Sequence, residues 1–510
     1  MNLGSLLRST AVVALLVIAV RPAPATIRYS VSFDHPEKHL FQVTMTVPVK
    51  GSDAVVALPA WNALYQIRDF AARLRDVKAS CHAPGSVPLQ LRQLDKDTWR
   101  VARSASCEPE VKSDFEIRYS IQWDDAGPFN SQLNEHHAFI NLAEILISVP
   151  DRRSEDTQIT FVNVPEGWNI TSELAAGSEP SSFVAPTYDA LVDAPVEAGK
   201  FDEFKFESGG AHFRVIVDAA SWNQGRLENA LRRITAYELQ LMGGAPFQEF
   251  AFFFHIGPEA AVGAGGMEHA NSTAIADTSI EGAASVAAHE FFHVWNVKRI
   301  RPQNLEPVDY TKEQYTRALW FAEGVTNTYC AFTLERTGLW SKRQFYDDLA
   351  SQIERVQSHP AHEWQSAEES SLDAWFEKYD AYNTPDRSIS YYDKGQIIGD
   401  MLDLAIRDAS DNHKSLDDVL RLMNEKYAKQ GRFYDETKDI RSAVEEVAGK
   451  SFEDFFRRYV SGTDEIPFND FLANAGLQLK TDAGFSVSEI SHPSDRQRRI
   501  REGFLHGSSD

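Results

Sequence analysis

Alternation of apolar and polar positions dominates the first two hundred residues that follow an N-terminal apolar run. Residues 26–33, 41–47, 115–121 and 158–162 follow this pattern, and turn residues separate them. Successive side chains of a strand point to opposite faces, so such runs are typical of strands that bury one face. The pattern predicts a β-rich, sandwich-like domain over residues 26–217.

The periodicity becomes helical near Ser221. Apolar residues then recur every three or four positions, which predicts a helix ending at Gly243 and Gly244. A dense apolar strand at residues 249–256, a glycine-rich turn and a strand to about residue 275 lead into two apolar helical patterns. This segment is predicted to form a second domain over residues 218–338.

Nearly all of the chain from residue 341 to about 475 has helical periodicity. The predicted helices lie at residues 344–356, 392–407, 416–427 and 440–447, within a helical domain over residues 339–480. Residues 481–510 are polar and rich in arginine, and we expect them to form a loose, charged tail. The fold class expected from these patterns is α+β and multidomain, as a chain of 510 residues would suggest.

The N-terminus has the layout of a secretory signal peptide. A short segment that ends at Arg8 precedes an uncharged apolar run over residues 10–20, and Ala23-Pro24-Ala25 offers a small-x-small cleavage site. We therefore expect residues 1–25 to be removed and the protein to be exported, as a periplasmic or secreted protein. The alternative is an uncleaved membrane anchor; after signal removal, no stable membrane insertion is expected.

Net charge narrows the classes of partner. The formal charge is −23, and loss of residues 1–25, which hold two arginines and no acidic residue, would leave −25. A chain this acidic repels nucleic acid and anionic membranes, so no nucleic-acid partner is expected. The sequence does not indicate an oligomeric state.

Three cysteines are too few for a metal–thiolate cluster or a disulfide framework. Cys81 and Cys107 lie in the N-terminal region and would be able to pair in an oxidising compartment, with two unpaired buried thiols as the alternative. Cys330 lies in a helical pattern and is predicted to be a buried free thiol.

An H-E-x-x-H sequence occupies residues 289–293, after an alanine-rich stretch that favours a helix. Residues four apart lie one turn above each other, so His289 and His293 can bind one metal ion through neutral imidazole nitrogens. Glu290 is offset from them and suits a general base that acts on a water molecule. The alternative is a pair of histidines on a solvated helix face, but the surrounding residues are apolar, and buried imidazoles and carboxylates need partners.

The third ligand is expected to be a side chain that leaves a fourth position open for water. Glu323 lies 30 positions after His293, inside a second apolar helical pattern where an unpaired carboxylate would be costly. Its alternative role is that of an ordinary surface glutamate. These residues predict a Zn²⁺ site in which Glu290 assists the attack of a zinc-bound water on a carbonyl.

Several longer segments carry a family resemblance. The segment His289–Pro302 resembles the signature of the glycyl aminopeptidase family, which are gluzincin peptidases that often carry a C-terminal PDZ domain. Further segments resemble other elements of that family: residues 58–61 with 67–70, residues 265–269, residues 320–326 and residues 390–395. The resemblance covers roughly residues 27–480.

The resemblance implies a thermolysin-like catalytic domain over residues 218–338 and roles for individual residues. Glu323 becomes the third zinc ligand, and Tyr392 becomes the oxyanion stabiliser, with Tyr391 as the alternative. Glu268 would bind the free α-amino group of the substrate, since a fixed carboxylate can pair with an ammonium group. The remaining substrate-binding residues that the resemblance implies are Gly265, Gly266, Met267, His269 and Tyr391. For His269 two roles stay open: it would either support Glu268 or face the substrate.

The family pattern is not complete, because only about thirty residues follow Leu479 and a PDZ domain needs more. Residues 477–480 and 485–490 are interpreted as the beginning of such a domain. The expected function is hydrolysis of the N-terminal peptide bond of peptides with a free N-terminus, with Gly or Ala preferred. The alternatives are a thermolysin-like endopeptidase, a zinc hydrolase that acts on a non-peptide bond, and a catalytically silent peptide-binding protein.

Overall fold

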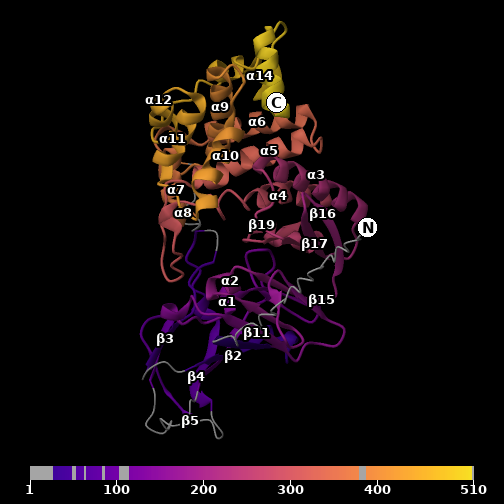
Figure 1. Ribbon diagram of the computed structural model, residues 1–510, viewed down its shortest axis with the longest axis vertical. Helices are drawn as coiled ribbons and strands as arrows, with labels where there is room; N and C mark the ends of the chain where they lie inside the picture. The colour runs from indigo at the N-terminus through magenta and orange to yellow at the C-terminus, as the bar shows by residue number, and fades with distance from the viewer. Residues whose placement is uncertain are drawn as a thin grey trace, which may run out of the picture.

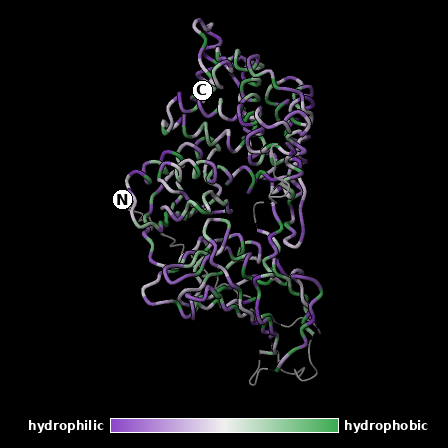
Figure 2. The backbone as a smooth tube through the Cα atoms, turned by 180° about the vertical axis from the view of Figure 1, so that it is seen from behind, coloured by the Kyte–Doolittle hydropathy of each residue, from purple (hydrophilic) through white to green (hydrophobic). Residues whose placement is uncertain are grey.

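The computed structural model describes residues 27–48, 53–62, 65–82, 87–102, 114–377 and 386–507. Three tiers follow one another along the long axis: a β-rich N-terminal tier, a central sheet with helices, and a helical C-terminal tier (Figure 1). Hydrophobic and hydrophilic stretches interleave through all three tiers (Figure 2). Within the described ranges, the helices are all too short or too polar to cross a bilayer. The predicted signal peptide lies outside these residues.

Three sheets build the N-terminal tier. The eight-stranded sheet has the order β13 (Ala175–Ala176), β14 (Ser182–Ala185), β11 (Thr157–Val162), β1 (Ile27–Ser32), β2 (Leu40–Val47), β8 (Asp114–Gln122), β4 (Leu74–His82) and β5 (Val87–Pro88). The four-stranded sheet has the order β12 (Asn169–Ser172), β15 (Pro195–Gly199), β10 (His137–Asn141) and β9 (Gln132–Leu133). The third has the order β3 (Asp53–Ala57), β7 (Thr98–Ala102) and β6 (Gln90–Gln93). Two short helices, α1 (Leu142–Ile145) and α2 (Tyr188–Val192), lie beside them.

The alternating pattern of these strands is satisfied by one shared core. Val31 in β1 and Ile117 in β8 belong to the same hydrophobic cluster as Ile140 in β10 and Val196 in β15. Side chains from two sheets therefore meet between them, and this confirms the β-rich, sandwich-like prediction.

The central sheet has five strands, in the order β16 (Asp202–Ser208), β17 (Ala211–Asp218), β18 (Glu249–Ile256), β20 (Ser272–Asp277) and β19 (Gly265–Glu268). Strands β17, β18 and β20 are parallel, whereas β16 and β19 pair with them antiparallel at the two edges. The predicted boundary at residue 217 is wrong, because β16 and β17 are hydrogen-bonded into this sheet. The second domain therefore begins near Asp202.

Two helices flank this sheet as predicted. Helix α3 (Gln224–Met242) begins at Asn223, whose side chain accepts a hydrogen bond from Arg226 N, and ends at Gly243 with φ of 81°. Helix α4 (Ile280–Phe292) begins at Ser279, whose hydroxyl accepts a hydrogen bond from Gly282 N. These caps satisfy terminal amides and fix where each helix starts.

The helical tier follows the predicted pattern. Its elements are a π-helical segment (Trp320–Val325), α5 (Thr326–Arg336), α6 (Lys342–Ser358), α7 (Ala367–Leu372), α8 (Ala374–Glu377), α9 (Tyr391–Ala409), α10 (Leu416–Lys426), α11 (Glu436–Ala448), α12 (Glu453–Phe455), a second π-helical segment (Phe456–Val460) and α13 (Phe468–Ala473). A single hydrophobic cluster runs from Phe213 of the central sheet through Met401 of α9 to Phe504. The central and helical tiers thus share one core.

The C-terminal segment differs from the prediction of a loose tail. Strands β21 (Leu477–Lys480) and β22 (Ser486–Glu489) form a hairpin, and helix α14 (Asp495–His506) follows it. Ile500, Phe504 and Leu505 of α14 are buried in the shared core. The strands expected to begin a PDZ domain are therefore a hairpin that packs with the helical tier.

The structure bears on the prediction for Cys330 but not on the predicted pairing of Cys81 with Cys107. Cys330 is a free thiol, as predicted, but it is partly buried and not fully buried. Its partial burial raises the pKa of the thiol well above the usual range. Cys107 lies outside the described residues, so its pairing with Cys81 stays a prediction.

Candidate active site

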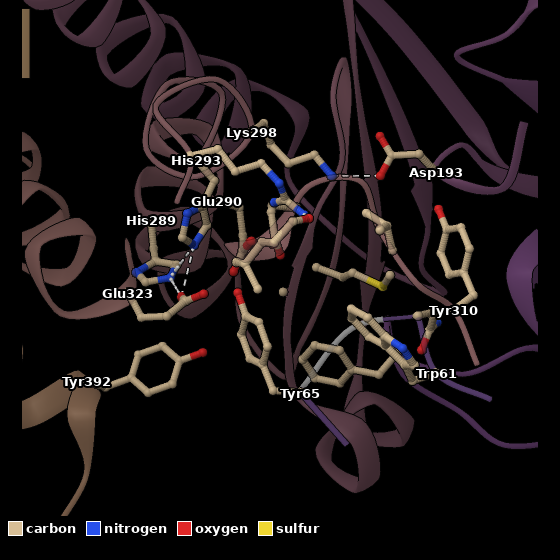
Figure 3. A pocket seen from close by; sticks show the side chains of 18 residues that line it. Trp61, Tyr65, Asp193, His289, Glu290, His293, Lys298, Tyr310, Glu323 and Tyr392 are labelled. Carbon is tan, nitrogen blue, oxygen red and sulfur yellow. Dashed lines mark hydrogen bonds and ion pairs between the residues drawn. The ribbon is translucent and has the colours of Figure 1, made fainter. Parts of the chain in front are cut away.

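The predicted ligand residues meet at one point between the central sheet and the helices. His289 Nε2 lies 2.9 Å from His293 Nε2, and Glu323 Oε2 lies 3.5 Å and 3.2 Å from these two atoms (Figure 3). Bonds of about 2.0–2.2 Å to one tetrahedral zinc ion would place its ligand atoms about 3.3 Å apart. The residues present therefore fit a zinc ion held by two imidazoles and one carboxylate.

Neighbouring side chains fix the orientation of these ligands. His293 Nδ1 donates a hydrogen bond to Asn296 O at 2.6 Å, which directs the lone pair of Nε2 toward the other two ligands. Asn296 Nδ2 donates to Phe321 O at 2.8 Å and to Thr326 Oγ1 at 3.1 Å. Asn296 thus ties the end of α4 to the π-helical segment that carries Glu323.

Electrostatics within the group favour a bound cation. Burial acts to lower the pKa of His293, but the Glu323 carboxylate outweighs it and raises that pKa to about 10. Burial opposes the charge of Glu323, yet His293 and His289 hold the pKa of its carboxyl well below the usual range. Burial and the neighbouring His293 instead lower the pKa of His289. The group thus holds one buried carboxylate whose negative charge a divalent ion can balance.

Glu290 lies beside the ligands, as predicted, without being one of the three. Its carboxyl is buried, and Oε2 has no hydrogen-bond partner among the described residues. Burial raises the pKa of this carboxyl well above its usual range, although the neighbouring His293 acts in the opposite direction. An unpartnered carboxyl oxygen aimed into a pocket is suited to accept a proton from water.

A glycine makes room for this carboxylate. A methyl group added to Gly266 would stand less than 3.0 Å from Glu290 Oε1. Gly266 lies in the edge strand β19, which β20 pairs on one side only among the described strands. The absence of a side chain at residue 266 therefore lets Glu290 lie directly against the edge of the sheet.

Most of the other predicted residues line the same cavity of about 130 Å³. Gly266, Met267 and Glu268 line it, and carboxylate oxygens of Glu268 and Glu290 and a nitrogen of His293 all lie within 4.8 Å of one another. Gly265 lies at the start of the same strand with φ of 142°, in the region that favours glycine, and faces the ring of Phe129.

The structure places His269 beside an ion pair. Its imidazole is buried, with Nδ1 3.8 Å from Asp193 Oδ1, and it is not part of the cavity lining. His269 follows the last residue of β19, which is Glu268. His269 thus lies beside the Asp193–Lys298 ion pair, which is 2.7 Å long and whose two residues line the cavity. Its role in substrate binding stays a prediction.

The structure also separates the two tyrosines at the start of α9. Tyr392 lines the cavity, its ring centroid lies 6.2 Å from that of His289, and its hydroxyl points toward the ligand group (Figure 3). Tyr391 is buried against Leu319 and Ala374. The geometry thus favours Tyr392 as the residue that faces the reacting atoms.

Sequence reasoning missed the contribution of the N-terminal tier to the cavity. Trp61, Tyr65 and Phe129 line it, as does Arg301 from the segment after α4. The Tyr65 hydroxyl points toward the middle of the site (Figure 3). The aromatic residues around residues 58–70 were a signal, but their contact with a site more than 200 positions away follows from the packing of the two tiers.

Comparisons with known proteins agree with this geometry. The M61 glycyl aminopeptidase profile matches residues 283–398, and the M61 peptidase N-terminal domain profile matches residues 28–200. No curated protein sequence matches the chain.

Solved structures share the fold. An aminopeptidase N family protein from Idiomarina loihiensis superposes with a TM-score of 0.82 at 25% identity, over 90% of this chain and 80% of that one. An M1 zinc metallopeptidase from Deinococcus radiodurans superposes with a TM-score of 0.52 at 16% identity, over 86% of this chain and 94% of that one. The two profiles together match more than half of the chain and include the three candidate ligand residues His289, His293 and Glu323. The chain belongs to the M61 glycyl aminopeptidase family and is a zinc metallopeptidase.

Proposed function

We propose that the protein is an aminopeptidase that hydrolyses the first peptide bond of substrates with a free N-terminus, with Gly or Ala preferred. The observation that carries the proposal is the position of Glu268, a carboxylate that is not one of the three zinc ligands yet lies beside Glu290 and His293. A carboxylate at that point can pair with an α-ammonium group and so fix the distance from the N-terminus to the reacting bond.

The edge strand supports the same mode of binding. Strand β19 leaves one side of its backbone unpaired by the described strands, and its residues Gly266–Glu268 face the cavity. An extended peptide can add to such an edge through main-chain hydrogen bonds. A Deinococcus radiodurans M1 metallopeptidase has been solved with a Tyr-Ser-Ala substrate, which agrees with a peptide as the ligand class.

Small size of the cavity supports the preference for small residues. Its volume of about 130 Å³ lies below the roughly 300–1,000 Å³ of ordinary ligand pockets. Trp61, Tyr65 and Phe129 fill the side of the cavity that belongs to the N-terminal tier. Large first side chains would have to displace these rings.

The proposed chemistry divides among three side chains of the chain. A bound zinc ion supplies Lewis acidity toward the substrate carbonyl and the attacking water. Glu290 accepts the proton of that water and passes it to the departing amine nitrogen. The Tyr392 hydroxyl donates a hydrogen bond to the oxygen on which negative charge develops, and Glu268 holds the substrate ammonium.

Paired substrates test the proposal. Gly- and Ala-arylamides should be cleaved and their N-acetylated forms should not, and Glu290→Gln should abolish cleavage while keeping zinc. Glu268→Gln should raise KM strongly for the free amines, whereas Glu281→Gln, a substitution of an exposed glutamate on α4, should change nothing. Cleavage of acetylated substrates would favour an endopeptidase, and binding without cleavage of any substrate would favour a silent peptide-binding protein.

Export is part of the same proposal, on the ground of the signal-like pattern of residues 1–25. Cell fractionation of the full chain and of a form that lacks residues 1–25 tests it. The full chain should be found outside the cytoplasm and the shortened form should stay inside.

A further inference from the structure

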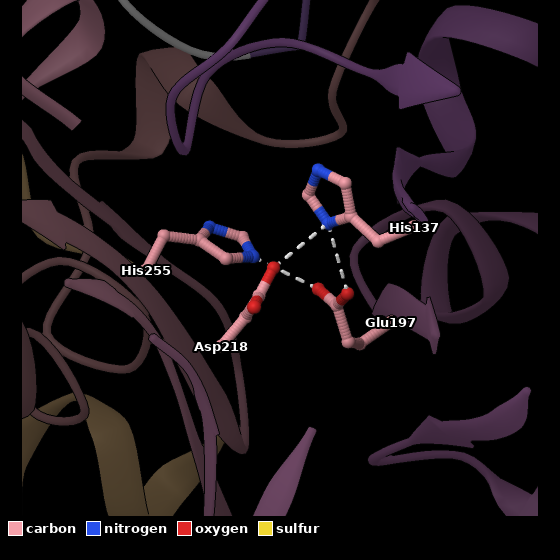
Figure 4. A group of neighbouring side chains, drawn as sticks. All are labelled: His137, Glu197, Asp218 and His255. Atoms are coloured by element: carbon pink, nitrogen blue, oxygen red, sulfur yellow. Dashed lines mark hydrogen bonds and ion pairs between the residues drawn. The ribbon is translucent and has the colours of Figure 1, made fainter. Parts of the chain in front are cut away.

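A second group of metal-ligating side chains lies away from the active site. His137, Glu197, Asp218 and His255 each bring one nitrogen or carboxylate oxygen to within 4.8 Å of the others (Figure 4). His137 Nδ1 lies 3.2 Å from Glu197 Oε1 and 3.2 Å from Asp218 Oδ2, and His255 Nε2 lies 2.9 Å from Glu197 Oε2. These distances resemble the spacing of about 3.3 Å expected for ligand atoms on one tetrahedral zinc ion.

The pairing of the strands that carry these four residues brings their side chains close together. Asp218 and His255 are direct partners in the parallel pair β17–β18. His137 lies opposite Gly199 in the pair β10–β15, two residues from Glu197 and on the same face. A methyl group on Gly199 would stand 2.9 Å from His137 Cβ, so the glycine leaves room for the imidazole.

The protonation of His137 restricts what the group can be. Its Nε2 lies 3.0 Å from Gln132 Oε1, so Nε2 is the nitrogen that donates a hydrogen. Nδ1 faces two carboxylate oxygens, and a bare lone pair there would be repelled by both of them. Nδ1 must therefore carry either a second proton or a metal ion, and the bond to Gln132 is the outer contact that metal-binding histidines usually make.

Burial adds to the requirement for positive charge. The Glu197 side chain is 2% exposed, and those of His137 and His255 are 15% and 17% exposed. With neutral imidazoles, the buried Glu197 carboxylate would lie beside the partly exposed Asp218 carboxylate with no cation, which is costly for Glu197. A cavity of about 420 Å³ lined by His137, Asp218 and His255 gives an ion and its water ligands a route in.

We propose that His137, Glu197, Asp218 and His255 form a second, structural site for a divalent transition-metal ion, best suited to zinc. Two imidazoles and two carboxylates match the mixed nitrogen and oxygen ligands that zinc accepts, whereas calcium and magnesium favour oxygen alone.

The site joins two parts of the molecule. His137 and Glu197 belong to the N-terminal tier, and Asp218 and His255 belong to the central sheet. The chain runs from His255 through a short 3₁₀ segment (Pro258–Gly263) directly into β19. A bound ion would therefore link the N-terminal tier to the segment that leads into β19, the strand that lines the active site. The link would hold the N-terminal tier and β19, which lie on two sides of the cavity, in fixed positions.

Metal stoichiometry tests this proposal independently of any peptidase activity. Protein purified with zinc and dialysed against zinc-free buffer should hold two equivalents by mass spectrometry of metals. His289→Ala should hold one equivalent, His255→Gln should hold one, and the double variant should hold none. His136→Gln, a substitution of an exposed histidine next to His137, should still hold two.

A spectroscopic measurement distinguishes loss of the second metal site from misfolding of a variant. In His289→Ala, added Co²⁺ should give the visible absorption of a four-coordinate site, and Asp218→Asn in that background should weaken Co²⁺ binding at least tenfold. The Asp218 side chain is 37% exposed, so its substitution leaves the core intact. Thermal unfolding of His289→Ala should shift upward with added zinc. One zinc that is lost in His289→Ala and kept in His255→Gln, with no Co²⁺ spectrum, would show that the four residues form only an ion-pair cluster.

Discussion

Gly324 and Gly395 contact each other where the π-helical segment crosses α9. A methyl group added to Gly324 would stand less than 3.0 Å from Gly395 Cα, and one added to Gly395 would stand 2.8 Å from Gly324 Cα. Glu323 precedes the first glycine and Tyr392 lies one turn before the second. The close contact between the two backbones therefore sets the distance between Glu323, the candidate third zinc ligand, and Tyr392.

Gly324→Ala is expected to push α9 away from the π-helical segment that carries Glu323. Overpacking of this kind costs about 1–3 kcal/mol of stability, and a displacement of about 1 Å at a catalytic group can lower activity by about a hundredfold. The measurements are the free energy of unfolding and kcat. Gly225→Ala is the matched control, because its added methyl group meets only Asn223 Oδ1, at 3.6 Å. If Gly324→Ala is as active as the control, the contact does not position Tyr392.

Comparison of Tyr392→Phe with Tyr391→Phe distinguishes the roles of the two adjacent tyrosines. Removal of a donor that stabilises an oxyanion lowers kcat by about 10²–10³-fold, while zinc content and KM should change little. Tyr391→Phe should keep nearly full activity, because Tyr391 packs against Leu319 and Ala374. Steady-state kinetics on Gly-arylamide checks both. The reverse order of effects would assign the role to Tyr391.

Gly266→Ala should remove activity without removing zinc. The added methyl group would occupy the space of the Glu290 carboxylate. Glu290, the proposed general base, is then displaced by about 1 Å or more, and kcat is expected to fall by at least about a hundredfold. His289, His293 and Glu323 do not contact this methyl group among the atoms nearest to it. Metal analysis alongside kinetics is the test, and loss of zinc together with activity would contradict the assignment of Gly266 to Glu290 alone.

Lys394 predicts a pH dependence of stability. Burial lowers the pKa of this amine to about 8, against about 10.4 in an unfolded chain. Between these values the unfolded state binds more protons, so stability rises with pH across that window. Lys394→Met should therefore be more stable than the native chain at pH 7 by about 1–3 kcal/mol, and the difference should shrink toward pH 10.

Urea unfolding at pH 7 and pH 10 measures this difference. Lys414→Met replaces a lysine whose side chain is 50% exposed, in a pair with Asp418, and should show no such change. A stability difference for Lys394→Met that is the same at both pH values would mean that the amine is not held in a desolvated site.

Local periodicity predicted those features that depend only on residues close together in the sequence, such as single helices and strands. His289 and His293 were predictable because a helix places residues four apart on one side. Strand β18 was predictable because its residues 250–254 form an unbroken apolar run. The boundary between the N-terminal tier and the central sheet was not predictable, because β16 and β17 alternate like the strands before them. Only the pairing of β17 with β18 assigns them to the central sheet.

Long-range contacts explain the remaining errors. Tyr65 and Arg301 enter the cavity through packing of one tier on another, which no local pattern records. In α14, Ile500 and Phe504 repeat at helical spacing, but the arginines around them suggested a solvated tail. Those arginines have partners: Arg501 lies 3.3 Å from Glu489, and Arg496 lies 2.8 Å from Asp408.

The edge position of β19 also bears on solubility. An unpaired strand edge is a template for association with other chains, and natural proteins cover such edges. Here Phe129 faces Gly265, and Trp61 lies across the same cavity, so the N-terminal tier stands over the open edge. The side chains that narrow the cavity also keep this edge from pairing with a second molecule, so a substitution that loosens them is expected to favour aggregation.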